Sequence, residues 1–131
     1  MALKLVLKPG EKIAINGAVV VNGDRRTSFA IENEARILRE ADIIQHEDAT
    51  TPAARIYLPI MMMYLTPEST DKMQTEYEKR LAEFVQVISD ADALSTCARI
   101  NAHIASNAYY KAMTECRALM EFEKTRLSDV A

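Results

Sequence analysis

Two Asn-Gly pairs, Asn16-Gly17 and Asn22-Gly23, constrain how this chain can fold more than any other feature. The Asn-Gly dipeptide suits the two central positions of a type I′ turn, because both positions need a positive φ. The four residues between the pairs, 18–21, are mostly valine, and β-branched side chains favour strands. The sequence therefore predicts tight β-hairpins near the start of the chain.

Short strands are expected on both sides of these turns. Residues 3–8 alternate leucine with lysine or valine, which is the period-two pattern of a strand. Pro9-Gly10 then predicts a type II turn, with proline and glycine at its central positions. Further strands are predicted at 12–15, 19–21, 27–32 and 36–39. Strands this short need a helix over one face, or a second copy of themselves, to be stable.

The remainder of the chain has helical periodicity. Thr51-Pro52 is a helix-start signal before an apolar segment at 53–65. A stripe from Met73 to Ile88 predicts a second helix, and Ser89 to Asp92 can cap a last helix that runs from 93 to about 127. We expect an α+β fold. A small N-terminal antiparallel β unit of short hairpins spans 1–50, and a helical region at 51–131 comprises an apolar helix and a long antiparallel helical pair. The helices pack on the β unit as one compact domain, or extend from a β head.

Charge is distributed unevenly along the chain. The net charge is −3, which by itself argues against general nucleic-acid binding. Residues 1–39, however, carry seven basic and four acidic residues, whereas the remainder carries nine basic and fifteen acidic residues. A cationic first part and an acidic second part indicate two different roles.

The cations of the first part form the candidate RNA-binding set. They could be only the solvated faces of edge strands, where lysine also blocks aggregation. Two of them directly follow a tight turn, where guanidinium groups and backbone N–H groups can meet a phosphate. Aromatic side chains for base stacking are scarce, since Phe29 is the only one in the β unit. The candidate residues are Lys4, Lys8, Lys12, Arg25, Arg26, Arg36 and Arg39.

The apolar helix predicted at 53–65 is the candidate partner-binding segment. It is apolar on nearly all sides, so most of its surface should be covered by the protein core or by a partner. Its consecutive methionines suit an adaptable contact. The candidate residues are Ile56, Tyr57, Ile60, Met61, Met63 and Tyr64.

Chemistry-bearing motifs are missing from the sequence. It has no glycine-rich phosphate loop beyond residue 23, no nucleophile elbow and no Cys-x-x-Cys pair. Cys97 and Cys116, if on one helix, would lie roughly 28 Å apart, beyond disulfide reach. His46 beside two acidic residues reads as a solvated loop rather than a metal site. We expect no enzyme activity, no metal and no cofactor. With no secretory signal and no apolar stretch long enough to span a bilayer, we expect a cytoplasmic protein without membrane contact.

A set of short segments stands out within roughly residues 2–65: 3–5, 7–11, 15–19, 22–26, 37–43 and 51–57. In their order and spacing these segments resemble the FlbT family of flagellum regulators of α-proteobacteria. Ala54 stands where that family commonly has arginine, and the helical half matches the family only in character.

This resemblance implies post-transcriptional control of flagellin synthesis. Family members associate with the 5′ untranslated region of flagellin mRNA, alter its translation or stability, and work with a second small flagellar protein, FlaF. The resemblance therefore predicts a flagellin mRNA leader and FlaF as partners, with flagellin as a further candidate. Because strands this short can be stabilised by a second copy of themselves, we also expect a homo-oligomer. The alternative is a protein-interaction module that binds flagellin, a flagellin chaperone or FlaF, with any effect on RNA indirect.

Overall fold

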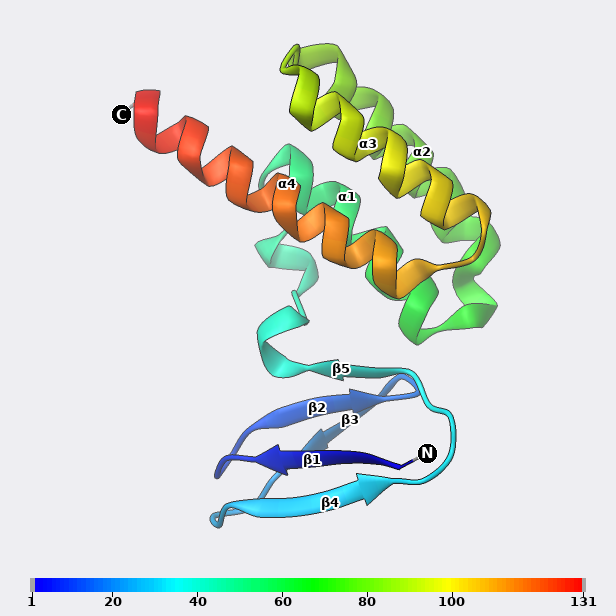
Figure 1. Cartoon of the computed structure of the whole chain (residues 1–131), viewed down its shortest axis with the longest axis vertical. Helices are drawn as coiled ribbons and strands as arrows, with labels where there is room; N and C mark the ends of the chain where they lie inside the picture. The colour runs from blue at the N-terminus through cyan, green and yellow to red at the C-terminus, as the bar shows by residue number, and fades with distance from the viewer. Residues whose placement is uncertain (1, 131) are drawn as a thin grey trace. The chain divides into compact units, whose positions relative to one another are not determined.

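The computed structural model describes residues 2–130, with side chains over residues 2–126. The chain divides into two compact units, Met1–Ile43 and Ile44–Ala131. Within the described residues, the strands all belong to the first unit and the α-helices to the second (Figure 1). The α+β class predicted from the sequence is confirmed.

The first unit, the β unit, contains two small antiparallel sheets. One sheet pairs β1 (Leu3–Leu7) with β4 (Thr27–Ile31). The other has the strand order β3-β2-β5, with bounds Ala18–Val21, Lys12–Ile15 and Ile37–Arg39. Because β1 and β2 belong to different sheets, the Pro9-Gly10 turn joins the two sheets. The predicted pairing of the first two strands as a hairpin is therefore wrong.

One of the two Asn-Gly pairs makes the predicted hairpin turn. Asn16 has φ 52° and Gly17 has φ 88°, as a type I′ turn requires, and β2 pairs with β3 across them. Neither Asn22 nor Gly23 has a positive φ. This second pair instead leads the chain from β3 into β4 of the other sheet, so its predicted hairpin is wrong.

The core of the β unit lies on the inner faces of its strands. Leu5, Leu7 and Ile13 are buried, and they occupy alternate positions of their strands, as side chains on one face must. Each such burial contributes about 1.5–3 kcal/mol relative to an exposed side chain. The partly buried side chains packed against them are Ile15, Phe29, Ile31 and Ile37.

Along residues 2–130, three short 3-10 helices and four α-helices follow the strands. The 3-10 helices are Glu40–Asp42, His46–Asp48 and Pro67–Ser69. The α-helices are α1 (Pro52–Leu65), α2 (Thr70–Val87), α3 (Ala91–Ala105) and α4 (Tyr109–Val130). Within the second unit, the helical unit, α1 packs against both α2 and α4, and α3 packs against α4.

The start of α1 is fixed by two side-chain caps. The Thr51 Oγ1 atom accepts a hydrogen bond from the Ala54 N–H at 3.2 Å, and Pro52 occupies the first helical turn, as predicted. The Ala53 N–H donates to Glu123 Oε2 of α4 at 3.0 Å. An acidic side chain at a helix N-terminus is favourable both as an acceptor and towards the helix dipole. This bond therefore ties α4 to the start of α1.

The long final helix predicted at 93–127 is divided in two, so that part of the prediction is wrong. Asn107 has φ 60°, and the N–H of Ala108 turns back to the carbonyl oxygen of His103 at 2.8 Å. Asparagine tolerates the left-handed conformation that usually calls for glycine after a helix. The break therefore arises without any glycine or proline. The start of α3 follows the prediction, since Asp90 Oδ2 accepts from the Ala93 N–H at 3.0 Å.

The two cysteines form no disulfide, as predicted, and both are buried. The 28 Å separation assumed one continuous helix and does not hold, because Cys97 lies on α3 and Cys116 on α4. Burial raises the pKa of both thiols, most strongly that of Cys116. A raised pKa keeps a thiol protonated and unreactive at neutral pH.

Candidate nucleic-acid interface

The turn between β1 and β2 forms as the sequence predicts. Gly10 has φ 71°, and the Glu11 N–H donates to the Lys8 carbonyl oxygen at 3.1 Å. This is the hydrogen bond of a β-turn with Pro9 and Gly10 at its centre, and the positive φ at the second central position is that of type II. The turn exposes the side chain of Lys8 to solvent.

A second turn, at residues 22–26, is bound directly to the first. The Asn22 side-chain amide donates to the carbonyl oxygens of Lys8 and Arg25, both at 2.8 Å, and to that of Leu7 at 3.3 Å. The backbone adds two further bonds, from Gly10 N–H to Gly23 O and from Asn22 N–H to Glu11 O, both at 2.9 Å. We call this arrangement the Asn22 clamp.

The clamp brings cations from two distant parts of the sequence to one end of the β unit. Figure 1 shows the β1–β2 and β3–β4 connections side by side at that end. Lys8, Lys12, Arg25 and Arg26 are all exposed there, and we call these four residues the cationic end. Within the part of the chain that the structure describes, their side chains form no ion pair. Their charges are therefore available to an anion.

Arg39 lies near this end but is already engaged. Its guanidinium forms an ion pair with Glu11 at 3.0 Å and donates to the Val6 carbonyl oxygen at 2.9 Å. The other Glu11 oxygen accepts the Lys8 N–H at 2.8 Å. This backbone bond and the bond from Arg39 lower the pKa of Glu11. The Arg39 side chain is 43% exposed, yet its contacts hold β5 to β1 rather than leave its charge free.

The remaining two predicted cations lie elsewhere in the β unit. Lys4 is exposed on β1, opposite Ala30 of β4. Arg36 is partly buried beside the β2–β3 turn, where its N–H donates to Asn16 Oδ1 at 2.9 Å and its carbonyl oxygen accepts the Asn16 N–H at 2.8 Å. The Arg36 Nε atom is buried and has no hydrogen-bond partner. The structure thus gathers four of the seven candidates, with Arg39 adjacent and paired.

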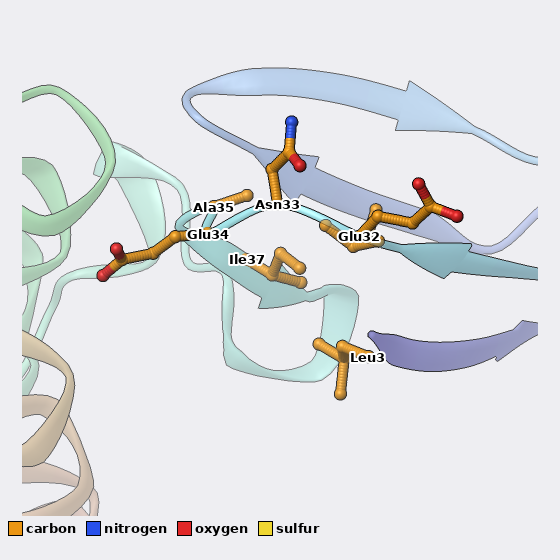
Figure 2. A pocket seen from close by; sticks show the side chains of 7 residues that line it. Leu3, Glu32, Asn33, Glu34, Ala35 and Ile37 are labelled. Carbon is orange, nitrogen blue, oxygen red and sulfur yellow. The ribbon is translucent and has the colours of Figure 1, made fainter. Parts of the chain in front are cut away.

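The opposite end of the β unit is acidic. A hollow of about 340 Å³ lies between the start of β1 and the loop that joins β4 to β5. Leu3, Ile31 and Ile37 give it an apolar lining, and Glu32 and Glu34 stand on the loop. Figure 2 shows their two carboxylates pointing in opposite directions. The carboxylates would repel a phosphate from this end.

The partner-binding candidates on α1 lie in the interior. Ile56, Tyr57, Ile60, Met61 and Met63 are buried, and Tyr64 is partly buried, with its ring 5.6 Å from that of Tyr110 on α4. The folded helical unit therefore buries five of these six side chains and leaves Tyr64 partly exposed. Its large exposed apolar residues within the described side chains are Val85, Val87, Leu94 and Tyr110.

Two members of the site were missed by reasoning from the sequence. Asn22 was assigned to a hairpin, whereas it clamps two turns together. Glu11 was not considered, although its carboxylate engages Arg39. The signal for Asn22 was its side-chain amide beside a glycine, but only the fold shows which carbonyl groups it meets.

Among residues 2–130, no group of three or more His, Cys, Asp or Glu side chains is placed to hold a metal ion. None of the described helices combines the length and the apolar character needed to cross a membrane.

The geometry defines a small two-unit α+β protein whose β unit carries a cationic end suited to anions. Comparison with known proteins shows which family the sequence belongs to. The sequence profile of the flagellar protein FlbT family matches residues 3–127. The chain belongs to the FlbT family, which confirms the resemblance seen in its sequence.

Relatives of known name match the chain over nearly its whole length. A probable flagellum biosynthesis repressor protein FlbT from Caulobacter sp. (strain K31) is 48% identical, covering 100% of both chains. The flagellum biosynthesis repressor protein FlbT of Caulobacter vibrioides (strain CB 15) is 47% identical over 100% of this chain and 93% of its own. A probable repressor from Rhodopseudomonas palustris (strain TIE-1) is 39% identical over 98% and 99%. No solved structure matches the chain significantly. These relatives support a regulatory role in flagellum synthesis.

Proposed function

We propose that this protein is a non-enzymatic, cytoplasmic regulator of flagellin synthesis that binds the 5′ untranslated region of flagellin mRNA through its cationic end and thereby controls translation or stability. The observation that carries the proposal is the Asn22 clamp, which gathers Lys8, Lys12, Arg25 and Arg26 without ion-pair partners. Guanidinium groups match phosphate geometry, and a pair of them beside a turn can grip one phosphate or two adjacent ones.

The shape of the β unit favours single-stranded RNA. RNA sequences are usually read in loops and unpaired segments, where bases can be splayed out. The cationic end is a pair of turns rather than a helix fitted to a groove, so it suits a bent, unpaired leader. Phe29, the aromatic residue of the β unit, is packed against the core, so base stacking contributes little and phosphate contacts dominate.

The direct test measures binding of a labelled flagellin leader RNA by fluorescence anisotropy. Arg25→Ala combined with Arg26→Ala should weaken binding roughly 100-fold or more, because each charge-assisted hydrogen bond contributes about 1.5 kcal/mol or more and every 1.4 kcal/mol is about a factor of ten. A matched control removes the same charge from exposed α2 positions by Lys72→Ala with Lys79→Ala. The control should bind nearly as well as the wild type. Equal losses in both double variants would remove the cationic end as the site.

The second candidate is a protein-interaction module for FlaF, flagellin or a flagellin chaperone. It is favoured by Val85, Val87 and Leu94, which expose apolar surface around the α2–α3 connection. A pull-down from RNase-treated lysate separates the two candidates. Retention of FlaF or flagellin, with no leader RNA recovered from untreated lysate, would favour protein interaction. Recovery of leader RNA that depends on Arg25 and Arg26 would favour RNA binding.

A further inference from the structure

The strand β3 has an unpaired outer edge. In the order β3-β2-β5 it pairs only with β2, and no other strand of the described residues reaches its far side. Val19, Val20 and Val21 are 61%, 41% and 58% exposed. An edge strand that shows apolar side chains on both faces is a template for another strand.

The β2–β3 hairpin decides which backbone groups point outward. The two-residue turn makes Ile15 and Ala18 a hydrogen-bonded pair, and such pairs alternate along an antiparallel ladder. The N–H and C=O groups of Val20 therefore point to β2, whereas those of Val19 and Val21 point to the free edge. The Asn22 N–H, which donates inward to Glu11 O, fits this alternation.

No charge protects this edge. Residues 13–23 contain no charged side chain and no proline, although lysine and proline are the usual devices against edge pairing. A strand that pairs here therefore meets an uncharged ladder over its whole length.

The two ends of the β unit have opposite charge character. Asp24 and Arg25 follow β3 after Asn22 and Gly23, at the cationic end. The other end holds the Asn16-Gly17 turn, which is bonded to Arg36 and so lies beside the loop with Glu32 and Glu34. When two β3 strands pair antiparallel, the cationic end of each copy lies beside the acidic end of the other. Parallel pairing would place like charges together.

We propose that a second copy of this chain occupies the free edge, by antiparallel pairing of β3 with β3 about a two-fold axis at Val20. Val19 of each copy exchanges backbone hydrogen bonds with Val21 of the other, and the two Val20 residues face each other as a non-hydrogen-bonded pair. The joined sheet has six strands, and its two cationic ends lie at opposite sides of the interface. The pairing is isologous, since one patch meets itself.

A cysteine substitution tests the register. Non-hydrogen-bonded antiparallel pairs hold their Cα atoms about 4.5 Å apart, which is within disulfide reach. Val20→Cys should form an intermolecular disulfide under mild oxidation, seen as a dimer on non-reducing gels. Val6→Cys, at another exposed valine of the β unit, should not, and the native cysteines are buried. Failure of Val20→Cys to cross-link, or equal cross-linking of both variants, would overturn the proposed register.

Sedimentation velocity tests the interface itself. The molecular mass obtained for the wild type should be about twice the chain mass of 14.7 kDa. Val19→Lys places a charge on the edge, and Val21→Pro removes an outward N–H without touching the β2 pairing; both should yield monomers with unchanged circular dichroism. Added salt should raise the dimer dissociation constant, because opposite charges face each other. A monomeric wild type, a dimer that survives both substitutions, or a dimer strengthened by salt would overturn the proposal.

Discussion

The Asn22 clamp predicts a stability change that can be located within the β unit. Its amide nitrogen makes two bonds of 2.8 Å and one of 3.3 Å to backbone carbonyl oxygens. A typical hydrogen bond contributes about 1 kcal/mol net. The bond of 3.3 Å contributes less than the other two because it is longer, and water can reach this partly exposed site and replace part of what is lost. Asn22→Ala should therefore cost about 1–2 kcal/mol.

An isosteric variant sharpens the prediction. Asn22→Asp keeps the size of the side chain but replaces the donating nitrogen with a carboxylate oxygen that faces the same carbonyl groups. Unlike truncation, this change sets a carboxylate oxygen against backbone carbonyl oxygens at hydrogen-bond distance, and this repulsion should make it cost more than Asn22→Ala. Asn33→Ala, at an exposed asparagine of the acidic end, is the matched control and should be near neutral.

Native-state hydrogen exchange locates the effect. The Gly10 and Asn22 amides bond between the two turns, so their exchange reports separation of the turns. A loss of about 1–2 kcal/mol corresponds to roughly 5- to 30-fold faster exchange at these amides. Exchange in α1 and α4 should not change. Unaltered protection of Gly10 in Asn22→Ala, or Asn22→Asp no less stable than Asn22→Ala, would refute the reasoning.

Three further predictions concern single residues elsewhere. The lowered pKa of Glu11 means that its bonds to the Lys8 N–H and to Arg39 stabilise the fold above the ordinary carboxyl range, and that this stability is lost as pH falls through the folded-state pKa. The stability advantage of the wild type over Glu11→Gln, measured by urea titration, should therefore be present at about pH 7 and decline as the pH falls through the folded-state pKa; an advantage that grows with acid would contradict this. Asn107→Ala should have a free energy of unfolding about 1 kcal/mol smaller than that of Asn107→Gly, because alanine adopts φ 60° only with strain whereas glycine does not; equal stability of the two variants would contradict this. Cys116, whose pKa burial raises, should react with Ellman's reagent only as fast as the helical unit opens, and immediate reaction in native buffer would contradict its burial.

The sequence predicted local features well because short-range chemistry decides them. The type I′ turn at Asn16-Gly17 needs only two residues that tolerate positive φ, and the Thr51 cap needs only a hydroxyl before Pro52. The strand positions followed from period-two patterns. These features depend on neighbours within about five residues along the chain.

Strand pairing could not be predicted, because it depends on long-range contacts. Nothing local distinguishes β1 paired with β2 from β1 paired with β4, since both arrangements bury Leu5 and Leu7. Asn22-Gly23 has the composition of a hairpin turn, but the Asn22 side chain gains two carbonyl partners, Leu7 and Lys8, from a distant turn, besides Arg25 in its own turn. Tertiary contacts therefore overrode the local preference.

In the candidate site, too, the sequence predicted the local features but not those that depend on long-range contacts. The sequence identified the cations, but it did not separate those that stay free from Arg39, whose partner Glu11 lies 28 residues away along the chain. Likewise, an apolar helix predicted that residues such as Ile60 would be covered. Only the structure showed that α2 and α4 pack against that helix.

The salt dependence of RNA binding tests the central claim most directly. For single-stranded nucleic acid, the slope of log K against log salt concentration is about −0.7 per phosphate contact. Removing both guanidinium groups by Arg25→Ala with Arg26→Ala should therefore flatten the slope for a flagellin leader RNA by roughly 1.4 relative to the wild type. Lys72→Ala with Lys79→Ala should leave the slope unchanged. A wild-type slope near zero, or the same slope in the wild type and the arginine variant, would contradict binding through the cationic end.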